Sequence, residues 1–184
     1  MMTFSPDAVW TIIVLSRGLP YFTQTLSKHA ALHAIDNRRL EVTNDDVEAS
    51  MTKFIEDSQK SFKEAYRHAI RSNQDNFFEH SLLACALAKA DDEGFFTAND
   101  VVEPYSAIMK EKKRIAHFEK HLRRFSSDEG GNILYKRGGE RKQQFRFKDP
   151  MMQPYVIIRG IQNKLIPDAA KAILFQREQG TLPI

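Results

Sequence analysis

A change of hydrophobic period constrains the fold of this chain more than any other feature. Over most of the chain, apolar residues recur every three or four positions, the spacing of one helix face. In residues 132–137 and again in residues 144–148 the period is two, and Gly138-Gly139 lies between these runs. Alternation on both sides of a glycine turn predicts a β-hairpin. The sequence therefore predicts a mainly α fold that contains one small hairpin.

Capping residues predict where the helices of the first half begin. Ser5-Pro6-Asp7 suits a helix start, because Ser caps, Pro fits the first helical position and Asp favours the positive end of the dipole. Pro20 and Thr43 begin the next two helices, and a fourth covers residues 62–70. The polar run 72–76 is the expected domain boundary. Residues 1–75 are thus expected to form a helical bundle.

The second half is expected to contain three helices before the hairpin. They cover residues 77–90, 98–109 and 112–125, and Pro104 is expected to bend or split the second. In the third helix, apolar residues at 115, 118, 122 and 125 define one face. Three helices followed by a hairpin are the element order of a winged helix, here residues 76–148. Residues 149–184 add helices at about 151–161 and after Pro167, and these are expected to pack on the winged helix.

Charge is concentrated in one segment of the chain. Residues 110–148 hold 13 Lys and Arg against five Asp and Glu, a net charge of +8 in a chain whose total is +3. Such asymmetry indicates an anionic partner, and the position on the third helix and the hairpin favours DNA. A solvated surface or a protein-docking face is the alternative. The residues expected to contact DNA are Lys113, Arg114, His117, Lys120, Arg123 and Arg124 on the helix, and Lys136, Arg137, Arg141 and Lys142 around the hairpin.

Two segments carry a resemblance to a known family. Ser16-Arg17-Gly18-Leu19-Pro20-Tyr21-Phe22 places a Gly-x-Pro at a helix start, and Phe145–Ile161 closes the hairpin through Asp149-Pro150. With the element order between them, they resemble the lid and winged helix of bacterial AAA+ and STAND-type ATPases, a layout that origin-recognition initiators share. The resemblance covers roughly residues 5–161. It implies that the segment from Arg17 through Gly18, Leu19 and Pro20 to Tyr21 lies against ATP, bound with Mg²⁺ in the full-length protein.

The chain departs from that family in two ways. It lacks the Gly-x-x-x-x-Gly-Lys-Ser/Thr loop that binds phosphates, so we expect a C-terminal portion without catalytic residues or cofactor of its own. Lids of the family often carry an arginine three residues after the glycine, where this chain has Tyr21, and Arg17 is the candidate in its place. The resemblance implies the upstream ATPase core as a partner and a homo-oligomer of the parent. The alternative function is a docking or autoinhibitory module of a signalling ATPase.

Other possible sites are less favoured by the sequence. Cys85 is the single cysteine and lies in an apolar run, which predicts a raised thiol pKa and excludes an internal disulfide. The pairs His29/His33 and His117/His121 have helical spacing, but neither has the Glu or Cys that would complete a zinc site. The longest apolar stretch, residues 8–15, is too short to span a bilayer. We therefore expect a cytoplasmic protein with no metal and no membrane partner.

Overall fold

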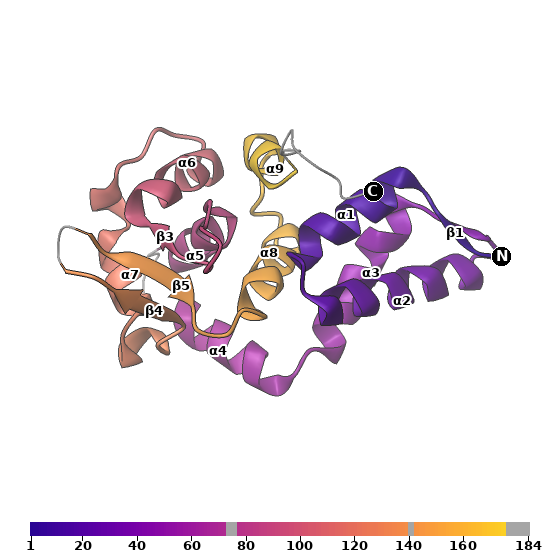
Figure 1. The fold of residues 1–184 in the computed structure, drawn as a ribbon, viewed down its shortest axis with the longest axis horizontal. Helices are drawn as coiled ribbons and strands as arrows, with labels where there is room; N and C mark the ends of the chain where they lie inside the picture. The colour runs from indigo at the N-terminus through magenta and orange to yellow at the C-terminus, as the bar shows by residue number, and fades with distance from the viewer. Residues whose placement is uncertain (73–76, 140–141, 176–184) are drawn as a thin grey trace.

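The computed structural model describes residues 1–72, 77–139 and 142–175. Its first half contains the helices that the capping residues predict (Figure 1). These elements are β1 (Thr3–Phe4), α1 (Pro6–Ser16), α2 (Pro20–Asp36), β2 (Glu41–Val42), α3 (Asn44–Asp57) and α4 (Lys60–Ile70). Ser5 accepts the Ala8 N–H through its side chain at 3.2 Å and so caps α1. The short strands β1 and β2 pair in parallel and were not predicted.

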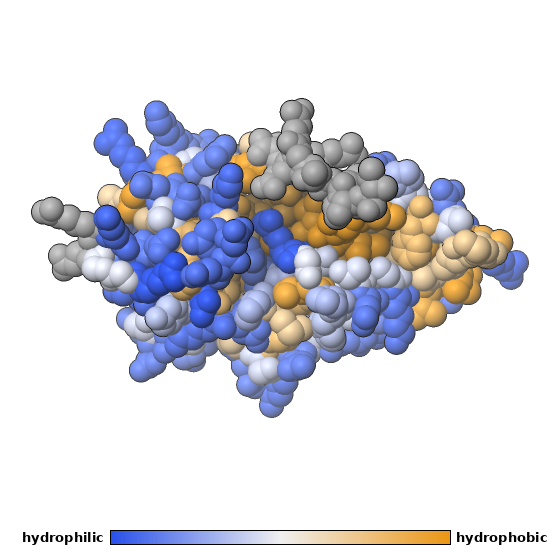
Figure 2. All heavy atoms as spheres, in the orientation of Figure 1, coloured by the Kyte–Doolittle hydropathy of each residue, from blue (hydrophilic) through white to orange (hydrophobic). Residues whose placement is uncertain are grey.

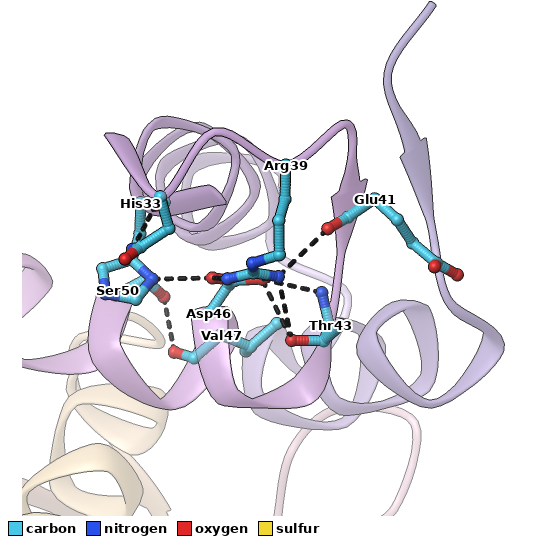
Figure 3. A network of polar contacts seen from close by, with 8 residues as sticks. His33, Arg39, Glu41, Thr43, Asp46, Val47 and Ser50 are labelled. Carbon is cyan, nitrogen blue, oxygen red and sulfur yellow. Dashed lines mark hydrogen bonds and ion pairs between the residues drawn. The ribbon is translucent and has the colours of Figure 1, made fainter. Parts of the chain in front are cut away.

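A buried carboxylate fastens the start of α3 to the end of α2 (Figure 3). Asp46 is fully buried and accepts the Thr43 backbone N–H at 2.8 Å, which completes a capping box. Arg39 donates to both carboxylate oxygens, and His33 Nδ1 lies 2.6 Å from Oδ1. The hydrogen bond from Arg39 holds the pKa of Asp46 far below its ordinary range, against the opposing effect of burial. The carboxylate therefore stays charged in the folded chain.

The second half combines short helices with a three-stranded antiparallel sheet. The predicted hairpin is present as β4 (Leu134–Arg137) and β5 (Gln144–Phe147). A strand that was not predicted, β3 (Phe96–Thr97), pairs with the other side of β5, so the strand order is β3-β5-β4. The helices are α5 (Phe78–Leu87), α6 (Ala98–Met109) and α7 (Glu119–Phe125), with 3₁₀ turns η1 (Ile115–His117) and η2 (Asp128–Gly130). α6 is continuous through Pro104 and is not split.

The expectation of one continuous helix over residues 112–125 is wrong. α6 ends at Lys110, which adopts a left-handed conformation with a φ of 54°. The backbone N–H of Lys113 is then bonded to the Ser106 hydroxyl at 3.0 Å, and that of Arg114 to His117 Nδ1 at 3.1 Å. Because side chains accept the N–H groups at residues 113 and 114, the backbone there needs no helical bonds. Only residues 119–125 form the α-helix α7.

Helix α8 (Met152–Gln162) lies between the two halves (Figure 1). It packs against α1 and α3 on one side and against α5 on the other, while α9 (Asp168–Leu174) packs against α6. The side chains of Tyr155, Val156, Ile157 and Ile158 are all buried. Because α8 is apolar and is covered on several sides, it joins the bundle and the sheet-containing half through a shared core.

Candidate nucleic-acid interface

Helix α7 is fixed on the second half by one apolar face and one polar contact. Phe118, Leu122 and Phe125 are buried, as the spacing predicts. His121 Nδ1 lies 2.6 Å from the hydroxyl of buried Ser81 on α5. Burial lowers the pKa of His121 to about 4, so this side chain is neutral at pH 7. The opposite face of α7 presents Lys120 and Arg123 to solvent.

A groove of about 570 Å³ separates α7 from the hairpin. We call it the α7–hairpin groove. Its lining comes from the start of α6, from η1, from α7 and from the residues that lead into β5: Thr97, Ala98, Asn99, Ile115, Glu119, Leu122, Arg123, Lys142, Gln143, Gln144 and Phe145. Two residues that the sequence assigned to DNA contact from separate segments, Arg123 and Lys142, therefore line one groove. The amides of Asn99, Gln143 and Gln144 were missed, because uncharged polar residues resemble any surface position in the sequence.

Strand register divides the predicted hairpin cations between two faces of the sheet. Lys136 pairs in register with buried Phe145, so Lys136 belongs to the core side of the sheet, although it is exposed. Arg137 is the next residue along β4 and belongs to the outer side, together with Tyr135. Arg141 lies outside the described residues. The period of two could have predicted this division from the sequence, once the pairing register was known.

Arg137 is held by contacts within the protein. Its guanidinium donates to Glu93 at 2.7 Å and to the Gln144 side chain at 3.0 Å, and it lies 3.9 Å from an Asp91 oxygen. The same group stacks 3.5 Å from the centre of the Phe95 ring. Its side chain is 38% exposed. Arg137 thus joins the acidic loop at residues 91–93 to the sheet, a role that differs from the phosphate contact expected from the sequence.

Three more of the predicted DNA-contacting residues have carboxylate partners. Lys113 pairs with Glu111 at 2.6 Å, and Arg123 pairs with Glu119 on α7. Arg124 pairs with Glu129, donates to the Arg71 carbonyl at 3.1 Å and lies 4.7 Å from the centre of the Phe78 ring. Arg124 therefore serves to connect η2 and α7 to the end of α4. Among the predicted residues, the exposed cations without an ion pair to another described residue are Arg114, Lys120, Lys136 and Lys142.

The segment expected to face ATP forms the turn between α1 and α2. Arg17 and Gly18 both have positive φ angles, 49° and 74°, a conformation that glycine adopts without strain. Leu19 caps α2 and Pro20 begins it. The guanidinium of Arg17 points to the second half, where Nη2 lies 3.4 Å from the Ala86 carbonyl at the end of α5. Gln153 of α8 donates to the same carbonyl at 2.9 Å, and Tyr21 is 43% exposed.

The histidines of the first predicted pair and the cysteine lie in contact with other groups of the fold. His29 lies 3.5 Å from Asp57, and His33 belongs to the Asp46 network. Among residues 1–72, 77–139 and 142–175, no group of three or more His, Cys, Asp or Glu side chains is placed to hold a metal ion. Cys85 is buried, and burial raises the pKa of its thiol, as its apolar surroundings predict. In its folded environment this thiol is protonated at neutral pH.

Comparison of the chain with protein-family models, with curated proteins and with solved structures gives no match. Within the part of the chain that the structure describes, no helix has both the length and the apolar composition needed to cross a bilayer.

Proposed function

We propose that this chain is the lid and winged-helix portion of an AAA+ or STAND-type ATP-binding protein, and that its α7–hairpin groove binds duplex DNA. The winged-helix proposal is supported by the order α5, α6, α7, β4, β5. Strand β3 supports it further, because pairing with β5 holds the hairpin beside α6 and α7. In this arrangement α7 enters the major groove and the hairpin reaches the neighbouring phosphates.

The observation that carries the DNA proposal is the convergence of cations from two segments on one groove. Lys142 of the hairpin and Arg123 of α7, which is paired with Glu119 of the same lining, line the groove. Exposed Lys136 lies on the same side of the sheet as Phe145. The first residues of α6, Ala98 and Asn99, bring the partial positive charge of a helix N-terminus to the same place. A groove with these properties suits a phosphodiester backbone, while α7, seven residues and about 10 Å long, offers Lys120 to base edges.

The ion pairs reduce the number of phosphates that the protein can neutralise. Of the ten residues expected to contact DNA, four are exposed and have no ion pair with a described residue: Arg114, Lys120, Lys136 and Lys142. With Lys120 at base edges, the other three cations give a salt slope of about −2.7, which corresponds to roughly a fortyfold loss of affinity between about 50 and 200 mM salt. The expected binding is therefore weak and strongly dependent on salt.

Fluorescence anisotropy with a labelled duplex tests the proposal. The variant Lys120→Glu/Lys142→Glu should abolish most of the binding at low salt, because it reverses the charge of Lys142 in the groove and of Lys120 on the exposed face of α7. The control variant Lys28→Glu/Lys60→Glu makes the same change in net charge on exposed positions of α2 and α4 and should bind as the native protein does. Equal weakening by both variants would mean that only net charge matters, and a flat native titration would end the DNA proposal.

A protein-docking or autoinhibitory module is the second candidate, and the ion pairs favour it. Lys113, Arg123, Arg124 and Arg137 all have carboxylate partners within the chain, so much of the basic segment is already neutralised. A surface with cations and anions side by side suits a protein partner better than a uniform phosphate backbone. Under this candidate, the native protein does not bind duplex DNA at low salt.

The proposed ATPase core would pack against the bundle. Helix α1 is apolar on its exposed side as well as its buried side, since Val9 is 42% and Ile13 is 46% exposed. Figure 2 shows hydrophobic side chains gathered over α1, whereas hydrophilic ones cover the sheet-containing half. We assign this α1 face to contact with the upstream core, which would bring the turn from Arg17 to Tyr21 close to the nucleotide. ATP and Mg²⁺ thus belong to the parent protein in this proposal.

A further inference from the structure

The outer face of the three-stranded sheet has a composition of its own. Tyr135 of β4 and Arg146 of β5 are paired in register, and the Arg146 guanidinium lies 5.5 Å from the centre of the Tyr135 ring. Phe95, just before β3, lies beneath both side chains: its ring is 6.1 Å from Tyr135 and 4.8 Å from the Arg146 guanidinium. We call Tyr135 and Arg146 the Tyr135–Arg146 surface.

Phe95 and Arg137 support this surface from below and from the side. Phe95 is only 4% exposed, so it supports the two side chains above it and does not itself contact a partner. Arg137 stacks on the same ring and is held by Glu93, so its charge is already paired. These contacts fix the position of the Phe95 ring, against which Tyr135 packs edge to face. The surface is thus held in place by the fold before any partner arrives.

Two groups on the surface are left for a partner. Tyr135 is 43% exposed, so no neighbouring element covers it completely. Arg146 is exposed and has no carboxylate partner among the described residues. Lys148, also exposed, comes at the next alternate position along the same stretch of chain. An exposed ring beside unpaired cations is what a nucleotide requires, because the ring stacks on the base and the cations neutralise phosphate.

We propose that the Tyr135–Arg146 surface binds single-stranded nucleic acid, with one base stacked on Tyr135 and the adjoining phosphate on Arg146. An acidic peptide would satisfy the cations equally well, but it would leave the exposed ring without a flat partner. Nucleic acid is therefore favoured. The surface lies on the face of the sheet opposite to Lys136 and Phe145, and neither Tyr135 nor Arg146 lines the α7–hairpin groove. Single-strand binding is thus independent of duplex binding, and either can fail alone.

The experiment compares two labelled oligonucleotides of ten nucleotides at low salt, one of deoxythymidine and one of abasic sugars with the same phosphates. The native protein should bind the thymidine strand more tightly, because only that strand has bases to stack. Tyr135→Ala should weaken binding of the thymidine strand by about tenfold and leave abasic binding unchanged. Tyr135→Phe should bind as the native protein does, because stacking needs the ring and not the hydroxyl. Arg146→Ala should weaken both strands.

Phe77→Ala is the matched control, since Phe77 is also an exposed aromatic residue, 48% exposed, but lies just before α5 and is not part of the sheet. This variant should bind both strands as the native protein does. Equal native affinity for the two strands, or an unchanged affinity of Tyr135→Ala for thymidine, would overturn the proposal. An oligoglutamate peptide provides a further test. If this peptide displaces the thymidine strand from the native protein but not from Tyr135→Ala, the proposal is overturned in favour of an acidic protein partner. Lys120→Glu/Lys142→Glu should keep the difference between the strands even if duplex binding is lost.

Discussion

The contact between Gly160 of α8 and Leu83 of α5 tests how the two halves are joined. A Cβ atom added at Gly160 would lie 2.6 Å from Leu83 Cδ1 and 2.8 Å from Cδ2, closer than carbon atoms can approach. Leu83 is 1% exposed, so its side chain cannot relax into solvent. Close packing of α8 on α5 thus depends on the missing side chain at Gly160, and Gly160→Ala should push the helices apart or force Leu83 out of its rotamer.

The magnitude follows from two opposing effects. Replacing glycine by alanine inside a helix ordinarily stabilises by about 0.5–1 kcal/mol. Overpacking a core costs about 1–3 kcal/mol, so the net effect of Gly160→Ala should be a loss of up to about 2 kcal/mol. Leu83→Ala alone should cost about 2–5 kcal/mol because it leaves a cavity. In the Leu83→Ala background the overlap is absent, so Gly160→Ala should stabilise the protein by about 1 kcal/mol.

Urea unfolding of the four proteins in this cycle measures the coupling between the two positions. The sign of the Gly160→Ala effect should reverse when Leu83 is already alanine. Gly139→Ala serves as the control, because a Cβ at Gly139 would have no atom within 4 Å. That variant should have a similar free energy of unfolding to the native chain. The packing argument fails if Gly160→Ala has the same effect in both backgrounds.

Two further predictions concern buried polar groups. Burial lowers the pKa of His121 to about 4, below the 6.5 of an unfolded chain, so the unfolded state takes up its proton first. The free energy of unfolding should therefore fall as pH drops from about 6.5 to 4, and urea midpoints should show a shallower fall for His121→Gln. Asp46→Asn should cost about 1.5–3 kcal/mol, because Arg39 and His33 lose their hydrogen bonds to a charged group. Thermal unfolding would measure this loss, with exposed Asp45→Asn as the control.

Most element boundaries follow from local sequence. The starts of α1, α2 and α3 were predicted from Ser5, Pro20 and Thr43, and Thr97 with Asp100 marks the start of α6. These caps act between residues three positions apart, as in the 2.7 Å bond from the Thr97 N–H to Asp100. The strands β1, β2 and β3 were missed, because two residues are too few to display an alternating pattern. The site was predicted in part, since Arg123 and Lys142 came from the sequence but their common groove did not.

The sequence by itself determined the helical periodicity, the caps, the hairpin and the concentration of basic residues in one segment, because each depends on neighbours along the chain. Tertiary structure decided which cations are paired within the chain and which are available to a binding partner. Arg137 meets Glu93 from 44 positions away, and Arg124 meets the Arg71 carbonyl from 53 positions away. It also moved the start of the predicted third helix from residue 112 to Glu119, since the Lys113 N–H is bonded to Ser106 and not within a helix. Such partners come together only when the core forms, because a charged side chain takes whichever counterion the packing brings within reach.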